Sequence, residues 1–227
     1  MGTRQTFEHQ LDELYEGLFR IGTMVEGALG HALAVIDSQN DEQAQEVVAG
    51  DSLINRAVYD LHDQALLVIA TQQPMARDLR LISVVISMLP ELERMADHAA
   101  TICKLQRRMM HESHYLPLEA IEGPFPSLIR EMGLRTAEIL HAGLDAIRQR
   151  DRGFADRVVK MDDVIDNLYS RVFRATVELA RTHPDLTDEA IHLLTLAHNL
   201  ERIGDRVTNL AEQIVFLLTG EVVELNY

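Results

Sequence analysis

The sequence contains no tryptophan, one cysteine and two lysines, and aromatic residues make up only 5% of it. With the single cysteine Cys103 the chain cannot form an internal disulfide, which fits a reducing compartment such as the cytoplasm. We interpret Cys103 as a small buried apolar side chain. The scarcity of aromatic rings favours aliphatic packing between helices over a β-sandwich.

Positive charge is also scarce. The chain has 36 acidic and 21 basic residues, and its formal net charge is −15. A field of this sign repels phosphate backbones, which argues against nucleic-acid binding, and it suits cations and basic protein surfaces. No cluster of basic residues for binding an anion is evident. The longest apolar runs, 66–70 and 81–89, are too short to span a bilayer, and the polar start shows no secretory signal.

Apolar residues recur at helical spacing along nearly the whole chain, and no convincing run of strict alternation is present. The pattern predicts an all-α fold with six helices, at about residues 4–37, 42–72, 74–110, 127–148, 154–181 and 188–218. Residues 38–41 offer a cap for the second helix, Pro74 suits the start of the third, and Gly220 suits the end of the sixth. Pro90 lies inside the third helix and is expected to bend it.

The chain shows signs of an internal duplication. Leu92-Glu93-Arg94-Met95-Ala96-Asp97 is repeated in the second half of the chain as Leu200-Glu201-Arg202-Ile203-Gly204-Asp205, and residues 114–126 hold three of the six prolines. We predict a first three-helix repeat at 1–113, a Pro-rich linker at 114–126 and a second three-helix repeat at 127–227. The simplest architecture is two pseudo-repeated antiparallel three-helix bundles placed end to end.

Each copy of the motif places a Glu one helical turn before an Asp, so both carboxylates share one helix face and repel each other. In an antiparallel hairpin, residues equally far from the turn lie at the same height. Asp51 and Asp97 are equally distant from Pro74 along the chain, one on each side of it, and so are Asn55 and Glu93. We call these four residues the first acid set.

The second half repeats this relation about the bond between His183 and Pro184. Asp162 comes level with Asp205, and Asp166 with Glu201; these four residues form the second acid set. Asn209, one turn beyond Asp205, extends it. Four clustered acids ionise together only at high cost without a cation. Oxygen ligands favour Mg²⁺, Mn²⁺, Ca²⁺ or iron over Zn²⁺. The sequence does not select a single ion, and iron, Mn, Mg and Zn all stay candidates.

Two other interpretations remain open. In one, the acids are a solvated helix face neutralised by Arg94, Arg202 and Arg206, and the protein is a structural adaptor without metal. In the other, the chain is a carboxylate-cluster metalloenzyme. No Gly-rich phosphate loop or nucleophile triad supports an enzyme, and we assign no catalytic residue.

The motifs resemble those of the PhoU family of phosphate-uptake regulators. The resemblance covers residues 6–218 and rests on Gln73-Pro74-Met75-Ala76-Arg77-Asp78-Leu79-Arg80-Leu81-Ile82, Leu92-Glu93-Arg94-Met95-Ala96-Asp97-His98-Ala99 and Asn199-Leu200-Glu201-Arg202-Ile203-Gly204-Asp205-Arg206-Val207-Thr208-Asn209-Leu210-Ala211-Glu212.

The resemblance implies two three-helix bundles with multinuclear metal clusters held by (Glu/Asp)-x-x-x-Asp motifs. It further implies a cytoplasmic, often dimeric, non-enzymatic regulator that reaches the membrane only through partners. These partners are the phosphate-specific ABC transporter and the sensor histidine kinase of the phosphate response. Asn55 departs from the family pattern, which commonly has an acid there, so we expect the second acid set to bind metal more tightly than the first.

Overall fold

The computed structural model of the chain describes residues 3–112 and 116–225. Within these ranges it contains six α-helices, two short 3₁₀ helices and no β-strand, which confirms the all-α prediction. The α-helices are α1 (Thr3–Ser38), α2 (Asp41–Gln72), α3 (Arg77–Met110), α4 (Phe125–Gln149), α5 (Phe154–Thr182) and α6 (Thr187–Thr219). The 3₁₀ helices are η1 (Leu118–Ala120) in the linker and η2 (Pro184–Leu186) before α6.

Capping residues set several of the helix ends. The side chain of Asn40 caps α2 by accepting a hydrogen bond from the N–H of Gln43 (3.1 Å), and Gly220 ends α6 in the left-handed conformation (φ 80°). Gln73, after α2, and Arg150, after α4, adopt the same left-handed conformation without being glycine. These two non-glycine caps are not visible as helix-ending signals in the sequence.

Two predicted helix starts were wrong. Pro74 does not begin α3 but lies in the turn before it, because Ala76 has a positive φ of 48° and helical geometry starts only at Arg77. At the other site, α4 begins at Phe125 rather than at the predicted Ser127, since Pro126 fits the first helical turn. Residues 125 and 126, the last two of the predicted linker, therefore belong to α4. Residues 114 and 115, the first two of the predicted linker, lie outside the described residues, and so does residue 113, where the first repeat was predicted to end. The division into two repeats stays a prediction.

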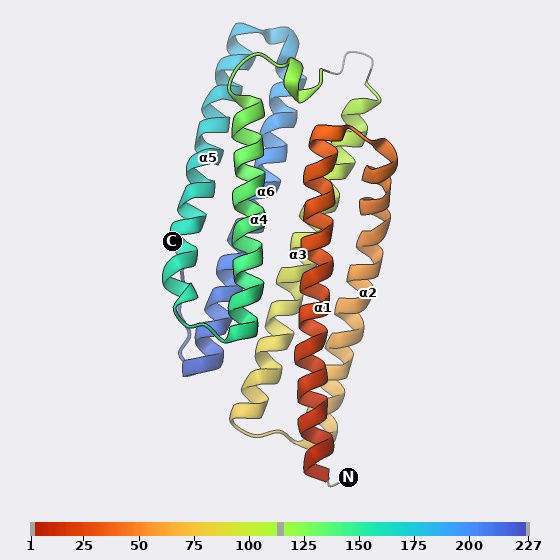
Figure 1. The fold of residues 1–227 in the computed structure, drawn as a ribbon, viewed down its shortest axis with the longest axis vertical. Helices are drawn as coiled ribbons and strands as arrows, with labels where there is room; N and C mark the ends of the chain where they lie inside the picture. Colours follow the sequence, from red (N-terminus) through yellow and green to blue (C-terminus); the bar gives the residue numbers. More distant parts are fainter. Residues whose placement is uncertain (1–2, 113–115, 226–227) are drawn as a thin grey trace.

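The two three-helix bundles lie side by side, which corrects the predicted end-to-end arrangement (Figure 1). Helices α1, α2 and α3 pack together, as do α4, α5 and α6, and α3 also packs along α6 while α1 contacts α4. Buried apolar residues from both halves form one continuous core. The end-to-end arrangement fails because α3 and α6 each carry a second apolar face, which only the opposite bundle covers.

The contact between the bundles has a pseudo-two-fold symmetry. A Cβ placed on Gly22 of α1 would lie 2.5 Å from Cδ2 of Leu144 on α4, and one placed on Gly133 of α4 would lie 2.7 Å from Cδ2 of Leu33 on α1. The offset along the chain from Gly22 to Gly133 equals the offset from Leu33 to Leu144. Each half therefore inserts the same leucine over the same glycine of the other half, in an antiparallel contact.

Helix α1 has the length and composition of a membrane-spanning segment over Gln5–Ser38. Its apolar stripe, however, lies in the protein core: Leu14, Leu18, Val25 and Leu29 are each about 1% exposed. The core of the bundle thus accounts for the apolar character of this helix.

The glycine contact between α1 and α4 gives a test of the side-by-side arrangement. We expect Gly22→Leu to destabilise the protein by about 1–3 kcal/mol, because the new side chain must displace Leu144. Gly27 lies on the same helix with nothing within 4 Å of its Cβ position, so Gly27→Leu should be neutral or stabilising by up to about 1 kcal/mol. Urea unfolding of the two variants measures the difference, and equal effects would contradict the arrangement.

Candidate metal centre

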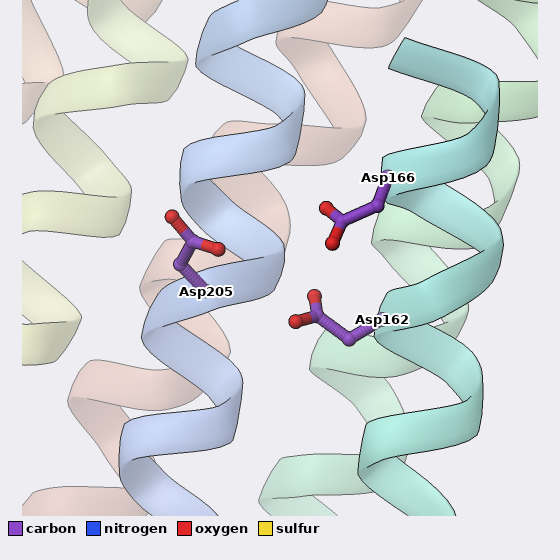
Figure 2. Close-up of side chains that lie close together, drawn as sticks. All are labelled: Asp162, Asp166 and Asp205. Carbon is purple, nitrogen blue, oxygen red and sulfur yellow. The ribbon is translucent and has the colours of Figure 1, made fainter. Parts of the chain in front are cut away.

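Three aspartates from two helices meet in the second bundle. Asp162 and Asp166 of α5 and Asp205 of α6 each offer a carboxylate oxygen, and these oxygens all lie within 4.8 Å of one another. Figure 2 shows the three side chains pointing toward one another across the α5–α6 groove. We call this group the carboxylate cluster. The fourth member of the second acid set, Glu201, lies one turn from Asp205 and raises the pKa of Asp162 through its charge.

Asp162 has the least favourable surroundings of the three. Its side chain is buried, with 8% of its surface exposed, and its Oδ1 atom has no hydrogen-bond partner. Burial, and then the charges of Asp166 and Asp205, raise its pKa from 3.8 to about 7. Burial and the neighbouring carboxylates also raise the pKa of Asp166 and of Glu201. A bound cation would relieve both the repulsion and the unpaired oxygen of Asp162.

A glycine on α6 makes room for the buried carboxylate. A Cβ placed on Gly204 would lie 2.8 Å from Oδ1 of Asp162 and 3.2 Å from Cδ1 of Ile165. The corresponding position in the first copy of the motif is Ala96. The absence of a side chain at residue 204 therefore allows Asp162 to sit close against the backbone of α6.

Few neighbouring side chains pair with the second acid set. The guanidinium of Arg202 contacts Asp205 (Nη1–Oδ2, 2.6 Å), and His198 Nδ1 lies 3.0 Å from Oε2 of Glu201. Asp162 and Asp166 have no such ion pair among the described residues. The cluster opens into a groove of about 410 Å³, which is also lined by Asn209 and, from the C-terminal tail, by Leu225. The groove gives a small cation access to the carboxylates.

The first acid set is arranged differently. Burial and the nearby charge of Asp97 raise the pKa of Asp51, while the positive charge of Lys104 and the amide of Asn55 lower it. The Oδ1 atoms of Asp51 and Asn55 are both buried without a hydrogen-bond partner. No three carboxylates of this set come within 4.8 Å of one another in the described chain, so Glu93 does not complete a cluster.

Of the nine predicted ligands, the structure thus brings Asp162, Asp166 and Asp205 closest together. Glu201 and Asn209 lie beside them, whereas the carboxylates of the first acid set lie farther from one another. Sequence reasoning missed Lys104 and Gly204. Lys104 is one of only two lysines and follows Asp97 after two helical turns, which places both on one helix face. The change from Ala96 to Gly204 was visible between the two motif copies.

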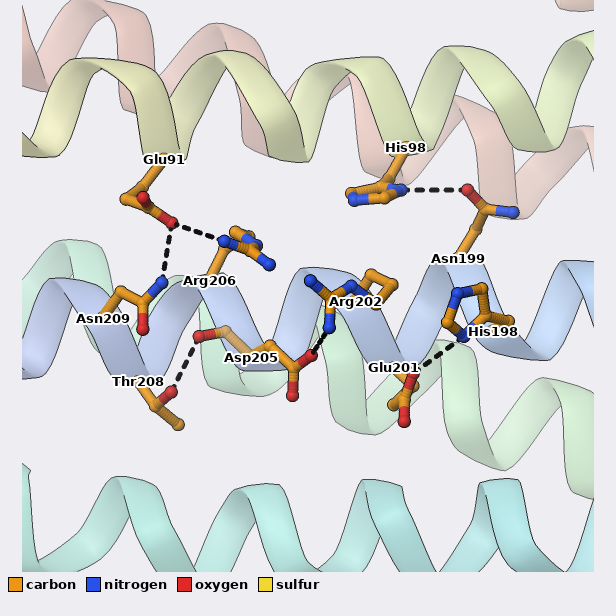
Figure 3. Close-up of polar contacts among 10 residues, drawn as sticks. All are labelled: Glu91, His98, His198, Asn199, Glu201, Arg202, Asp205, Arg206, Thr208 and Asn209. Carbon is orange, nitrogen blue, oxygen red and sulfur yellow. Dashed lines mark hydrogen bonds and ion pairs between the residues drawn. The ribbon is translucent and has the colours of Figure 1, made fainter. Parts of the chain in front are cut away.

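The residue after each motif Asp connects the two bundles. Arg206, after Asp205, contacts Glu91 of α3 (Nη1–Oε2, 3.3 Å), and His98, after Asp97, is hydrogen-bonded to Asn199 of α6 (Nδ1–Oδ1, 2.9 Å; Figure 3). Glu91 and Asn199 each come directly before their copy of the motif, and His98 and Arg206 each come directly after it. The two connections are therefore pseudo-two-fold equivalents. Each acid set is therefore backed by a polar contact to the opposite bundle.

Asn209 joins the first of these connections. Its Nδ2 donates to Oε2 of Glu91 (2.9 Å), the same oxygen that Arg206 contacts. The residue that was predicted to extend the second acid set thus also links α6 to α3.

Comparison with known proteins relates the chain to one family. The family model described as "PhoU domain" matches residues 18–106 and 129–214, one segment in each bundle. The chain is 32% identical over 225 residues to the phosphate-specific transport system accessory protein PhoU homolog of Clostridium acetobutylicum, covering 99% of each sequence. It is 28% identical over 215 residues to the phosphate-specific transport system accessory protein PhoU of Escherichia coli (strain K12), covering 95% of this chain and 86% of that protein.

Solved structures agree with this relation. The phosphate transport system regulatory protein PhoU from Streptococcus pneumoniae superposes with a TM-score of 0.85 at 25% identity, covering 96% of this chain and 99% of that one. PhoU from Pseudomonas aeruginosa superposes with a TM-score of 0.83 at 25% identity, covering 95% of this chain and 100% of that one. The two-bundle fold, the duplicated motif and the matches over both halves show that the chain belongs to the PhoU family.

Proposed function

We propose that this chain is a metal-binding regulatory adaptor of the phosphate-specific transport system that restrains phosphate uptake and the phosphate-starvation response. The single observation that carries the metal part is the buried, unpartnered Oδ1 of Asp162 among three other carboxylates. The relatives' names, which describe accessory and regulatory proteins of phosphate transport, support the regulatory part.

The residues of the second acid set fit a hard cation. All of them offer carboxylate oxygens, the donors that Mg²⁺, Mn²⁺, Ca²⁺ and iron prefer. Asp162, Asp166 and Asp205 would hold the ion, with Asn209 on the wall of the same groove and the charge of Glu201 nearby. A bound ion would supply positive charge that cancels the carboxylate repulsion and joins α5 to α6. The first acid set, which has Asn55 in place of an acid and Lys104 nearby, would bind more weakly.

The regulatory role requires contact with other proteins. The names of the relatives support the phosphate-specific transporter as one partner, and the family resemblance adds the sensor histidine kinase of the phosphate response. We further propose a homodimer that works in the cytoplasm and reaches the membrane only through these partners. The strongly acidic chain suits basic surfaces on such partners.

Two rival functions predict other results. A carboxylate-cluster metalloenzyme would show turnover, such as oxidase or phosphatase activity, once loaded with metal. A purely structural adaptor would contain no metal by elemental analysis after growth in a metal-rich medium. The pairing of Arg202 with Asp205 is the observation that favours the second rival, but it leaves Asp162 and Asp166 without a counter-charge.

Without metal, the cluster should make the protein less stable as the pH rises. The raised pKa of Asp162 means that the folded protein binds a proton more tightly than the unfolded chain, so the contribution of this group is lost as the pH rises from about 4 through about 7. In EDTA, Asp162→Asn should therefore be more stable than the wild type at pH 8, by roughly 1–3 kcal/mol. Urea unfolding at several pH values measures the difference.

The exposed neighbour provides the control for this prediction. Asp163→Asn removes the same charge from the adjacent position and should change the stability by much less. A difference between Asp162→Asn and the wild type that does not vary with pH would show that Asp162 is not held near its raised pKa.

The two acid sets should differ in metal affinity. We expect Glu201→Ala to weaken metal binding at least about tenfold, and Glu93→Ala to reduce the total metal bound much less, because only the second acid set gathers its carboxylates. Titration calorimetry with Mn²⁺ and Mg²⁺ on both variants, each checked for folding by circular dichroism, compares them. A larger loss from Glu93→Ala would reverse the assignment.

The regulatory role should be visible in cells. Deletion of the gene should raise expression of phosphate-starvation genes in phosphate-rich medium, and the wild-type gene should restore repression. A complementing gene with Asp162→Ala and Asp205→Ala should restore it less well if metal is required. Unchanged repression after deletion would refute the regulatory role.

A further inference from the structure

A second site lies at the opposite end of the bundles from the linker. It is a pocket of about 530 Å³ where α3 begins and α6 ends, at the lower end of the molecule in Figure 1. Residues of α1, α3 and α6 line it, together with Arg150 from the turn after α4. We call it the junction pocket, because both bundles contribute to its wall.

Three arginines line the junction pocket: Arg77, Arg80 and Arg150. In the part of the chain that the structure describes, none of them forms an ion pair with a carboxylate, although acidic residues outnumber basic ones. Guanidinium groups are well suited to phosphate, which they bind through two parallel hydrogen bonds.

Two of these guanidinium groups are held in place by neighbouring residues. Arg80 lies over the ring of Phe216 (5.8 Å to the centroid), and a Cβ placed on Gly220 would come within 2.8 Å of its Nη2 atom. Arg150 lies over the ring of Tyr15 (5.3 Å). A contact with an aromatic ring orients a guanidinium group, and a side-chain hydrogen bond to the Tyr15 hydroxyl further fixes Arg150. Both groups are therefore positioned before any ligand arrives.

The pseudo-two-fold symmetry shows that the fold does not require these arginines. The offset that superposes the two motif copies places Arg77 and Arg80 on Asp185 and Asp188, at the other end of the molecule. There the linker residues Leu118 and Ile121 are buried, and the space is reduced to pockets of about 160 and 10 Å³. Among the described residues, only the end without a linker combines a large pocket with arginines that lack a carboxylate partner.

The rest of the wall defines the ligand further. Four leucines supply apolar surface, and three acids supply hydrogen-bond acceptors; they are Leu11, Leu81, Leu217 and Leu218, and Glu8, Asp12 and Asp78. Orthophosphate would leave most of a pocket of this size empty, and its negative charge would lie among these acids. A phosphate ester that also carries hydroxyl groups and a ring would contact all three kinds of lining residue: the arginines with its phosphate, the acids with its hydroxyl groups and the leucines with its ring.

We propose that the junction pocket binds a small organic phosphate, its phosphate group held by Arg80 and Arg150 and its hydroxyl groups facing the acids. No run of basic residues marks the site in the sequence, since its arginines come from α3 and from the turn after α4. The proposal does not depend on the carboxylate cluster and can fail or hold separately from it.

Titration calorimetry of the full chain with AMP, ATP, glucose 6-phosphate and orthophosphate tests the proposal, with and without EDTA. We expect an organic phosphate to bind at least about tenfold more tightly than orthophosphate, and EDTA to leave this binding intact. AMP and glucose 6-phosphate distinguish a nucleotide from a sugar phosphate. Arg80→Gln and Arg150→Gln should each weaken binding at least about tenfold, the usual loss for a charged hydrogen bond.

Two further variants make the result specific. Arg152→Gln removes the same charge from the same turn, outside the pocket, and should leave binding unchanged. Phe216→Leu keeps every charge but removes the ring under Arg80, and should weaken binding. Circular dichroism confirms that each variant is folded.

Three outcomes would overturn the proposal. One is no binding of any organic phosphate, and another is binding of orthophosphate as tight as that of the esters. The third is binding that is lost in EDTA and indifferent to the arginine variants, which would assign the phosphate to metal in the carboxylate cluster.

Discussion

The packing of α3 against α6 is the contact on which the rest of the structure depends. Both helices carry the Glu-x-x-x-Asp motif, and successive residues of a helix point about 100° apart. Asp205 can therefore face α5 while Arg206 faces α3, and Asp97 can face α2 while His98 faces α6. One stretch of helix thus serves as the wall of an acid set and as the interface between bundles, so a shift of either helix would disturb both.

The second acid set shows how a stable fold retains an unfavourable electrostatic arrangement. Asp162 lies at the edge of the apolar core, on the wall of the groove and beside the fully buried Ile165, and Gly204 lets it approach α6 closely. Moving the carboxylate into solvent would require moving α5, with loss of that packing. In the first acid set the protein supplies its own cation, because Lys104 lies near Asp51. The two halves therefore solve the same repulsion in different ways.

Helical periodicity predicted the all-α class and most helix positions, because each apolar stripe is long and regular. Counting from the hairpin turns brought Asp162, Asp166 and Asp205 together correctly, since an antiparallel hairpin fixes the height of each residue. Local backbone conformation was less accessible, because residues 73, 76 and 150 adopt positive φ values without being glycine. The side-by-side packing was missed because it depends on a second apolar face of α3 and α6, which single-helix periodicity does not separate from the first. The junction pocket needed the tertiary structure, since its arginines come from opposite halves of the sequence.

The pseudo-two-fold contact between α1 and α4 has the form of an isologous dimer interface, in which the same surface meets itself. In this chain the two partners are covalently joined by the segment between Met110 and Phe125, so the contact forms at a high effective concentration and at a fixed stoichiometry. A dimer of identical three-helix chains would have to keep two identical sites. Because its halves are encoded separately, the joined molecule can carry an amide and a lysine at one site, four carboxylates at the other, and a linker across only one of its two ends.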